Sequence, residues 1–163
     1  MSLKTTLIGL GNILMRDEGV GIHVVKYIQE NFVVPPELEI VDGGTSGLDL
    51  LPFIEGRDQV LFVDTVNFNR EPGYISVLLN GQIPALSGTK DCLHHMGLMD
   101  VLAAARLLDK LPAQIALIGI QPHTIATGLD LSPSIQARLQ PLVDQILKQL
   151  AFWGLACRPC REF

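Results

Sequence analysis

Short runs rich in apolar residues alternate with longer stretches of mixed polarity along the chain. Four of these runs have the length and composition of buried parallel strands: TTLIGLG (5–11), LEIVDGG (38–44), QVLFVDTV (59–66) and QIALIGI (114–120). Three longer stretches carry apolar residues at helical spacing and are predicted to be helices: 19–31, 96–108 and 131–150.

Smaller elements are predicted from turn residues and prolines. LDLLPFI (48–54) is predicted to be a short helix interrupted by Pro52, and GYISVLL (73–79) a hairpin-like edge strand after the turn NREPG. Residues 80–93 are predicted to be a loop. The last helix begins with Ser132 as its N-cap and Pro133 in its first position, and Pro141 is predicted to bend it.

This order of strands and helices predicts an α/β fold. We expect a three-layer α/β/α sandwich around a largely parallel, mixed sheet of about five strands. No internal repeat or linker divides the sequence, so 1–150 is predicted to form a single domain. The end of the chain, FWGLACRPCREF, has no periodicity, and 151–163 is predicted to be a loosely attached tail.

Composition restricts the kinds of partner and compartment. Hydrophobic residues make up 48% of the 163 residues and charged residues 18%, which is typical of a compact globular protein. The formal charge is −5 with no basic run, which argues against nucleic acid or anionic membrane surfaces as partners. The apolar run at the N-terminus is too short for a signal peptide, and no apolar stretch is long enough to span a bilayer. Three cysteines are few and odd in number, so we expect a reducing cytoplasm.

Polar side chains follow three of the predicted strands. Glu18 comes after the first, Asp42 after the second and Asp64 after the third, while the pair His94–His95 lies at the entrance to the 96–108 helix. Ligands of open α/β sheets bind outside the carboxyl ends of the strands. We therefore expect these side chains to meet at one edge of the sheet.

The glycine-rich stretch GLGNILMRDEGVG (9–21) first suggests a dinucleotide site. The fingerprint needs glycine at three positions, and here Gly9 and Gly11 are present while Leu14 takes the third. Leu14 would obstruct the close approach of the helix, and the charge of Glu18 would repel phosphate. The sequence therefore disfavours a dinucleotide, although a cofactor-binding α/β enzyme of another class stays open.

A metal site is the other interpretation of these residues. Two carboxylates and one imidazole suit a borderline divalent ion such as nickel or zinc, and three protein ligands leave positions open for substrate or water. Each residue alone has a simpler explanation: Glu18 near a helix start, Asp64 capping a turn, Asp42 beginning a turn with Gly43 and Gly44. The metal prediction thus depends on convergence in the fold.

Taken together, five segments resemble the endopeptidases that mature the large subunit of nickel-iron hydrogenases. They occur in the family's order between about residues 6 and 150: GLGNILMRDEGVG, VDGGTSGLDLL, VLFVDTV, LHHMGLMDVL, and GIQP followed by LSPSI. Members of that family have an α/β/α fold and remove a short C-terminal extension from the large subunit after nickel has been inserted. The resemblance implies a hydrolase whose partner is that precursor, with nickel carried by the substrate and no organic cofactor.

The resemblance also implies roles for single residues. The family's metal ligands fall on Glu18, Asp64 and His94, with His95 standing where the family has glutamine. The aspartate of its Asp-Gly-Gly-Thr motif, implicated in cleavage or recognition, falls on Asp42, which becomes the catalytic candidate. We expect the free protein to be a monomer.

Two mechanisms are compatible with these residues. Nickel could polarise the scissile carbonyl or activate water as a Lewis acid, or it could anchor the substrate while Asp42 or a ligand carboxylate acts as general base. Besides the protease and a cofactor-binding enzyme of another class, a third function stays open: a non-catalytic metal-sensing chaperone of the same precursor. It stays open because the sequence contains no complete set of protease catalytic residues.

Overall fold

The computed structural model describes residues 3–83 and 96–161. Five strands form the central sheet in the order β3-β1-β4-β6-β5: β3 (Leu38–Gly44), β1 (Thr5–Leu10), β4 (Gln59–Thr65), β6 (Gln114–Ile120) and β5 (Ile75–Leu79). The first four are parallel, and β5 runs antiparallel to β6 at the edge. The predicted mixed, largely parallel sheet is confirmed.

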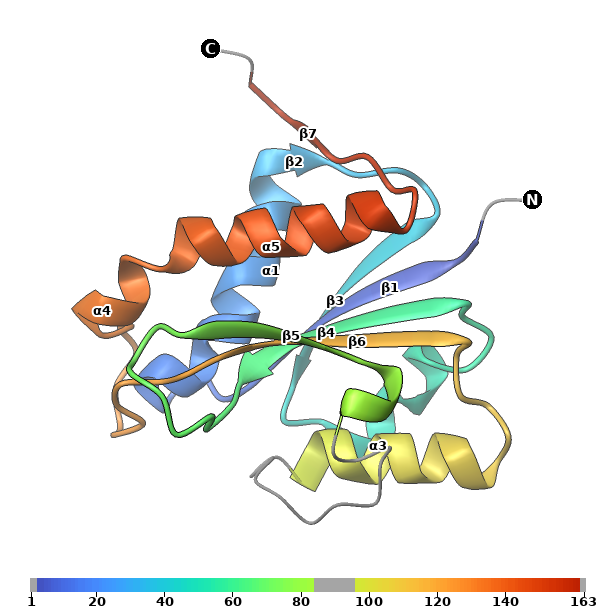
Figure 1. Ribbon diagram of the computed structural model, residues 1–163, viewed down its shortest axis with the longest axis horizontal. Helices are drawn as coiled ribbons and strands as arrows, with labels where there is room; N and C mark the ends of the chain where they lie inside the picture. The colour runs from blue at the N-terminus through green and yellow to red at the C-terminus, as the bar shows by residue number, and fades with distance from the viewer. Residues whose placement is uncertain (1–2, 84–95, 162–163) are drawn as a thin grey trace.

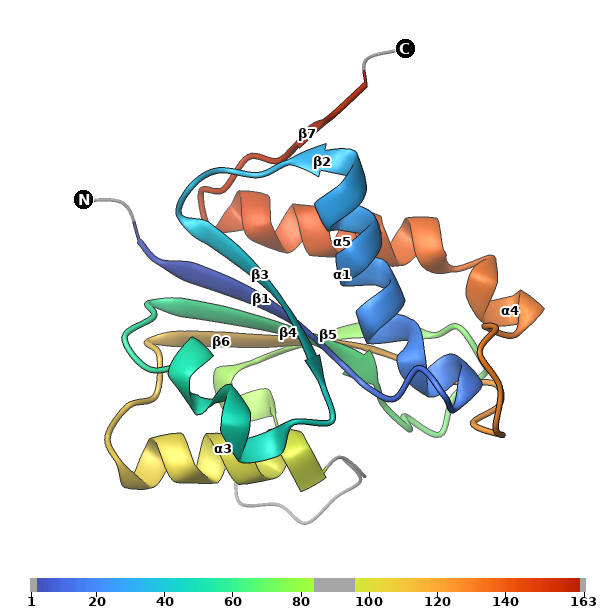
Figure 2. The ribbon, with the colours of Figure 1, turned by 180° about the vertical axis from the view of Figure 1, so that it is seen from behind.

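Helices cover both faces of this sheet, as Figures 1 and 2 show from opposite sides. One face is covered by α1 (Val20–Asn31) and α5 (Leu139–Phe152), and the other by α3 (Met96–Leu107) and the 3₁₀ helix η2 (Gly47–Phe53). Successive strand residues alternate between the two cores: Leu61 and Val63 pack beneath α1 and α5, whereas Phe62 packs against the α3 side. The structure is therefore the three-layer α/β/α sandwich that the sequence predicts.

Helix α1 lies unusually close to the sheet because two glycines face each other. Gly9 of β1 lies against the backbone of Gly21, and a Cβ on Gly21 would come closer than 3.0 Å to the carbonyl oxygens of Leu10 and Val63. Only glycine fits at this crossing, so the glycines of the first motif serve helix packing as well as the turn.

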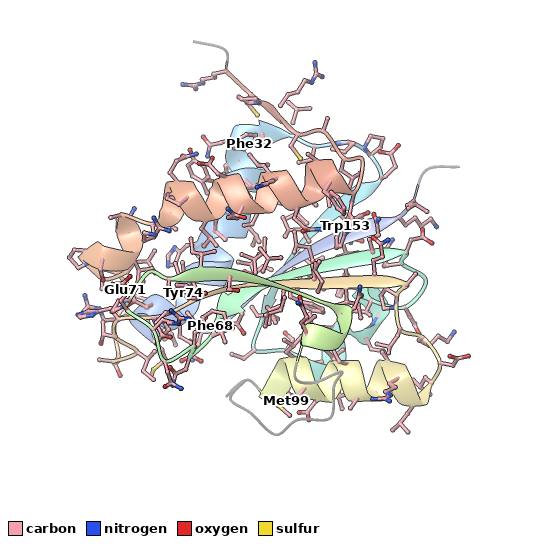
Figure 3. All side chains as sticks on the ribbon, viewed as in Figure 1. Phe32, Phe68, Glu71, Tyr74, Met99 and Trp153 are labelled. Atoms are coloured by element: carbon pink, nitrogen blue, oxygen red, sulfur yellow. The ribbon has the colours of Figure 1, made fainter. Side chains whose placement is uncertain are left out.

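The edge strand β5 differs from its prediction. Its edge position is correct, but its neighbour is β6, with which it pairs from Ile75–Ile120 to Leu79–Ala116. A hairpin with β4 is wrong because β6, apolar on both faces, lies between them. In the β4–β5 connection, the rings of Phe68 and Tyr74 pack edge to face at 5.4 Å (Figure 3).

The last predicted helix is two helices. Helix α4 (Pro133–Gln136) ends before Arg138, and α5 begins at Leu139. In the interior of a helix, Pro141 would lack the N–H for a hydrogen bond, and its ring would clash with the carbonyl four residues earlier. The helix therefore begins again just before Pro141, which lies in the first turn, where no N–H is needed. The break therefore precedes the proline.

The C-terminal segment crosses the predicted domain boundary at residue 150. Helix α5 continues to Phe152, Leu155 is buried, and β7 (Arg158–Pro159) pairs antiparallel with β2 (Phe32–Val33).

Two further 3₁₀ turns are η1 (Arg16–Gly19) and η3 (Asn80–Gln82), the latter at the start of the predicted 80–93 loop. None of the helices that the structure describes has the length and apolar character needed to cross a membrane.

Candidate active site

The candidate residues that the structure describes lie at the carboxyl edge of the sheet, where its strand order reverses. From β1 the chain passes through α1 to β3 on one side, and then through η2 to β4 on the other side of β1. The carboxyl ends of β1 and β4 thus meet at the switch point where open α/β sheets bind ligands. Glu18 in η1 follows β1, and Asp64 is the penultimate residue of β4.

The turn between β1 and η1 requires glycine and asparagine. Gly11 has φ 132°, and a Cβ there would overlap the carbonyl oxygen of Glu18. The side-chain oxygen of Asn12 accepts a bond of 2.9 Å from the Leu14 N–H. The glycine-rich stretch thus folds back on itself, which brings Glu18 over the end of β1 in place of a phosphate.

Glu18 and Asp64 form a pair of neighbouring carboxylates. Asp64 is 0% exposed, and its Oδ1 accepts a bond of 2.8 Å from the Thr65 N–H. Burial raises the pKa of the Asp64 carboxyl well above its usual range, and the negative charge of Glu18 raises that pKa further. A divalent cation between the two carboxylates would relieve both effects, so the donor set fits a metal ion.

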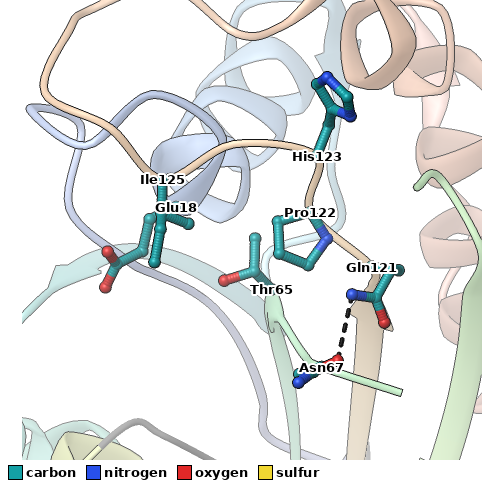
Figure 4. A pocket seen from close by; sticks show the side chains of 7 residues that line it. All are labelled: Glu18, Thr65, Asn67, Gln121, Pro122, His123 and Ile125. Atoms are coloured by element: carbon teal, nitrogen blue, oxygen red, sulfur yellow. Dashed lines mark hydrogen bonds between the residues drawn. The ribbon is translucent and has the colours of Figure 1, made fainter. Parts of the chain in front are cut away.

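Glu18 also lines a hollow of about 380 Å³ at this edge (Figure 4). Its other lining residues are Thr65, Asn67, Gln121, Pro122, His123 and Ile125. Gln121 fixes one wall, because its side chain accepts a bond of 2.6 Å from the Phe68 N–H and donates one of 3.2 Å to Asn67. The ring of His123 points away from Thr65 and Gln121 in Figure 4, so this histidine contributes mainly backbone to the wall.

Asp42 lies at the same edge but on the other face of the sheet. Asp42 of β3 pairs in register with Gly9 of β1, and Gly9 pairs with Val63 of β4. Asp64 therefore lies one residue beyond the level of Asp42, on a strand that β1 separates from β3. By strand alternation Asp42 faces the α1 side, as Ile40 does, whereas Asp64 faces the α3 side. The strand spacing puts about 10 Å between their backbones.

Asp42 therefore belongs to a different hollow from the carboxylate pair. This exposed side chain accepts a bond of 3.1 Å from the Gly44 N–H. It lines a space of about 450 Å³ with residues of the first turn and with Ile22 of α1. Of the candidates that the structure describes, Glu18, Asp42 and Asp64 share this edge, and only Glu18 and Asp64 lie together.

The third predicted ligand, His94, lies outside the described residues, as do His95 and Cys92. Helix α3, which follows them, packs on the face toward which Asp64 points. Helix α3 runs in the opposite direction to β6, the strand that follows it, so α3 begins toward the carboxyl edge of the sheet (Figure 1). Within residues 3–83 and 96–161, no three His, Cys, Asp or Glu side chains are grouped closely enough to hold a metal ion.

Sequence reasoning missed Asp17, the residue before Glu18. Its carboxylate is 0% exposed and accepts bonds from residues 123, 124 and 132, which no local sequence pattern indicates. Burial alone would raise the pKa of Asp17, but these hydrogen bonds outweigh burial and lower it. Ser132 occupies the predicted N-cap position, yet its hydroxyl donates to Asp17 and makes no capping bond.

Comparison with known proteins identifies relatives along nearly the whole chain. The sequence model of the hydrogenase maturation proteases matches residues 22–149. The Hydrogenase 2 maturation protease of Escherichia coli K12 is 32% identical over 158 residues, 96% of each chain. The hydrogenase expression/formation protein HupD of Bradyrhizobium diazoefficiens is 34% identical over 154 residues, 93% of this chain and 80% of that one. The solved hydrogenase maturating endopeptidase HybD from E. coli has a TM-score of 0.90 at 31% identity, covering 97% of this chain and 98% of that one.

Proposed function

Because this chain belongs to the hydrogenase maturation protease family and is an endopeptidase, we propose that it removes a C-terminal extension from the nickel-loaded large-subunit precursor of a nickel-iron hydrogenase. In this proposal nickel is part of the substrate, and the enzyme uses it as the recognition element. The name of the E. coli relative, Hydrogenase 2 maturation protease, supports a hydrogenase precursor as partner.

The observation that carries the proposal is the carboxylate pair at the switch point. Glu18 and Asp64 bring two carboxyl groups close together, one of them fully buried, and Glu18 lines a hollow open to a partner. Leaving a buried carboxylate without a cation costs several kcal/mol. A precursor that carries nickel offsets this cost, and an empty precursor does not.

In this proposal the three acidic residues have separate tasks. Glu18 and Asp64 would hold the nickel of the precursor, with His94 as the third ligand. Nickel held there supplies positive charge that can polarise a carbonyl or fix the substrate. Asp42, on the other face about 10 Å away by strand spacing, is better placed to contact the substrate chain than to take a proton at this pair. The general base would then be a carboxylate of the pair.

Cleavage of matched precursors tests the proposal. Nickel-loaded and nickel-free precursor are incubated with the enzyme under the same conditions, and the masses of both products are measured. We expect cleavage of the loaded form at least about a hundredfold faster, because several kcal/mol separate the two complexes and each ~1.4 kcal/mol is tenfold. Equal cleavage of the two forms would show that nickel is not the gate.

The same assay separates the alternative of a metal-sensing chaperone. A chaperone would bind nickel-loaded precursor in preference to the empty form but leave its mass unchanged.

We further propose that the enzyme acts as a monomer in the cytoplasm. The low and odd number of cysteines, three in the chain, supports a reducing compartment.

A further inference from the structure

Asp17 is the most extensively bonded acidic side chain in the described structure apart from the site itself. Its Oδ1 accepts a bond of 2.7 Å from the Ser132 N–H. Its Oδ2 accepts three, from the N–H groups of His123 (3.0 Å) and Thr124 (2.9 Å) and from the Ser132 hydroxyl (2.7 Å). Four donors from one loop thus converge on a carboxylate of the residue adjoining Glu18.

The backbone extends this attachment on both sides of Asp17. The Asp17 N–H donates to the Thr124 carbonyl at 3.2 Å, and the Arg16 N–H to the Gly128 carbonyl at 2.9 Å. In return the Gly128 N–H donates to the Leu14 carbonyl at 2.9 Å. Residues 14–17 and 124–128 therefore form one unit although more than a hundred residues separate them in the chain, and Figure 1 shows both at the same end of the sheet.

The attached loop forms a wall of the hollow that Glu18 lines. Pro122, His123 and Ile125 belong to this wall, and His123 donates to Asp17 through its backbone. In a 3₁₀ helix neighbouring residues point about 120° apart. When the loop holds Asp17 on one side of η1, the rotation of η1 directs Glu18 toward the hollow.

We infer that Asp17 is a positioning residue of the protease, which fixes the direction of Glu18 and the wall opposite it by holding the 121–132 loop. The inference rests on the proposed function, since it assigns a task within that reaction. Asp17 is fully buried, so in this inference it acts through Glu18 and not on the substrate or nickel. A misplacement of about 1 Å at a reacting centre can lower a rate by about a hundredfold.

A matched pair of substitutions separates positioning from plain stability. Ser132→Ala removes one buried hydroxyl bond to Asp17, while Thr5→Val removes a buried hydroxyl bond of 2.8 Å to Gln59 at the opposite end of the sheet. Thermal melting and the kcat and KM for nickel-loaded precursor are measured for both. We expect similar losses of melting temperature, a fall in kcat of about tenfold in Ser132→Ala, and a kcat within about twofold of wild type in Thr5→Val. Equal kcat in the two variants at temperatures where both are folded would overturn the inference.

Substitutions of Asp17 itself provide a graded series. Asparagine retains one oxygen, which can accept the three bonds that Oδ2 receives. Its NH₂ group then faces the Ser132 N–H, so only that one hydrogen bond is lost. Alanine loses all four bonds. We therefore expect Asp17→Asn to recover part of the kcat that Asp17→Ala loses, with KM changing less than kcat. Equal activity of the two variants contradicts a positioning role.

Amide hydrogen exchange distinguishes failure of this inference from failure of the proposed function. If the wild-type protein leaves nickel-loaded precursor intact, the proposed function is wrong. The positioning unit is then judged by exchange at Arg16 and Gly128, which we expect to accelerate at least about tenfold in Asp17→Asn and to stay at the wild-type rate in Thr5→Val. Unchanged exchange in Asp17→Asn overturns the inference whatever the precursor assay gives.

Discussion

Replacing Gly21 with alanine tests how closely α1 must approach the sheet for Glu18 to reach Asp64. The added Cβ would come closer than 3.0 Å to the carbonyl oxygens of Leu10 and Val63. Both are backbone atoms within the sheet, so no side-chain rotation relieves the overlap and α1 must move outward. Overpacking of this kind costs about 1–3 kcal/mol, and rigid neighbours put the cost near the upper end.

The net effect follows from two opposing contributions. Alanine favours the helix by about 1 kcal/mol relative to glycine, which leaves a loss of about 2 kcal/mol in the free energy of unfolding. In a domain of this size each kcal/mol shifts the melting temperature by about 2–4 °C, so we expect a fall of roughly 4–8 °C. Only Gly19 lies between Glu18 and α1, so Glu18 moves with the helix, and the cleavage rate should also fall by about tenfold at temperatures where the variant is folded.

Thermal melting and precursor cleavage measure these two effects. Gly81→Ala is the control, because a Cβ at Gly81 has no heavy atom within 4 Å and its backbone is not left-handed. It should melt within roughly 2 °C of wild type. If Gly21→Ala also melts within about 2 °C of wild type and cleaves at the full rate, the close approach of α1 is not needed for either property.

Three further predictions concern the carboxylate pair and its third ligand. Glu18→Gln and Asp64→Asn should each lower cleavage at least about a hundredfold while the isolated protein melts no lower than wild type, because each relieves the unfavourable placement of Glu18 beside the buried Asp64 carboxyl. Because the pKa of Asp64 is raised, the folded protein keeps a proton that the unfolded chain loses near pH 4. The free energy of unfolding, measured by urea titration, should therefore fall as the pH rises above about 4, and this fall should be smaller in Asp64→Asn. Calorimetry with nickel should show one site that His94→Ala abolishes and His95→Ala retains; the reverse result would reassign the ligand.

Local sequence patterns were sufficient for the layers and for the edge that carries the site. Short apolar runs such as that of β4 indicate buried strands, and parallel topology then brings the residues after β1 and within β4 to one edge. Glu18 and Asp64 could therefore be predicted to meet. Which face a side chain takes depends on strand register, and a shift of one residue reverses it, so the separation of Asp42 from Asp64 could not be predicted.

Long-range hydrogen bonds were the other feature beyond the reach of the sequence. Asp17 and Ser132 each have an ordinary local explanation, an acidic residue in a first turn and an N-cap, yet they bond to each other across 115 positions. The break between α4 and α5 had a local cause in Pro141, but the sequence predicted one helix bent at the proline and not two helices. The attachment of 14–17 to 124–128 depends on the whole β-α order, which brings the end of β6 beside η1.

The pairing of β7 with β2 has a consequence for the sequence Cys-Arg-Pro-Cys. Cys157 and Cys160 flank β7, and three residues of extended chain span about 10 Å, whereas a disulfide requires Cα atoms roughly 4.4–6.8 Å apart. Burial also raises the pKa of the Cys157 thiol, which disfavours its reactive thiolate form. The two-residue strand β7 thus holds the two cysteines apart. A disulfide between Cys157 and Cys160 can form only after β7 has detached from β2. Oxidation of this pair would therefore report release of the C-terminal segment.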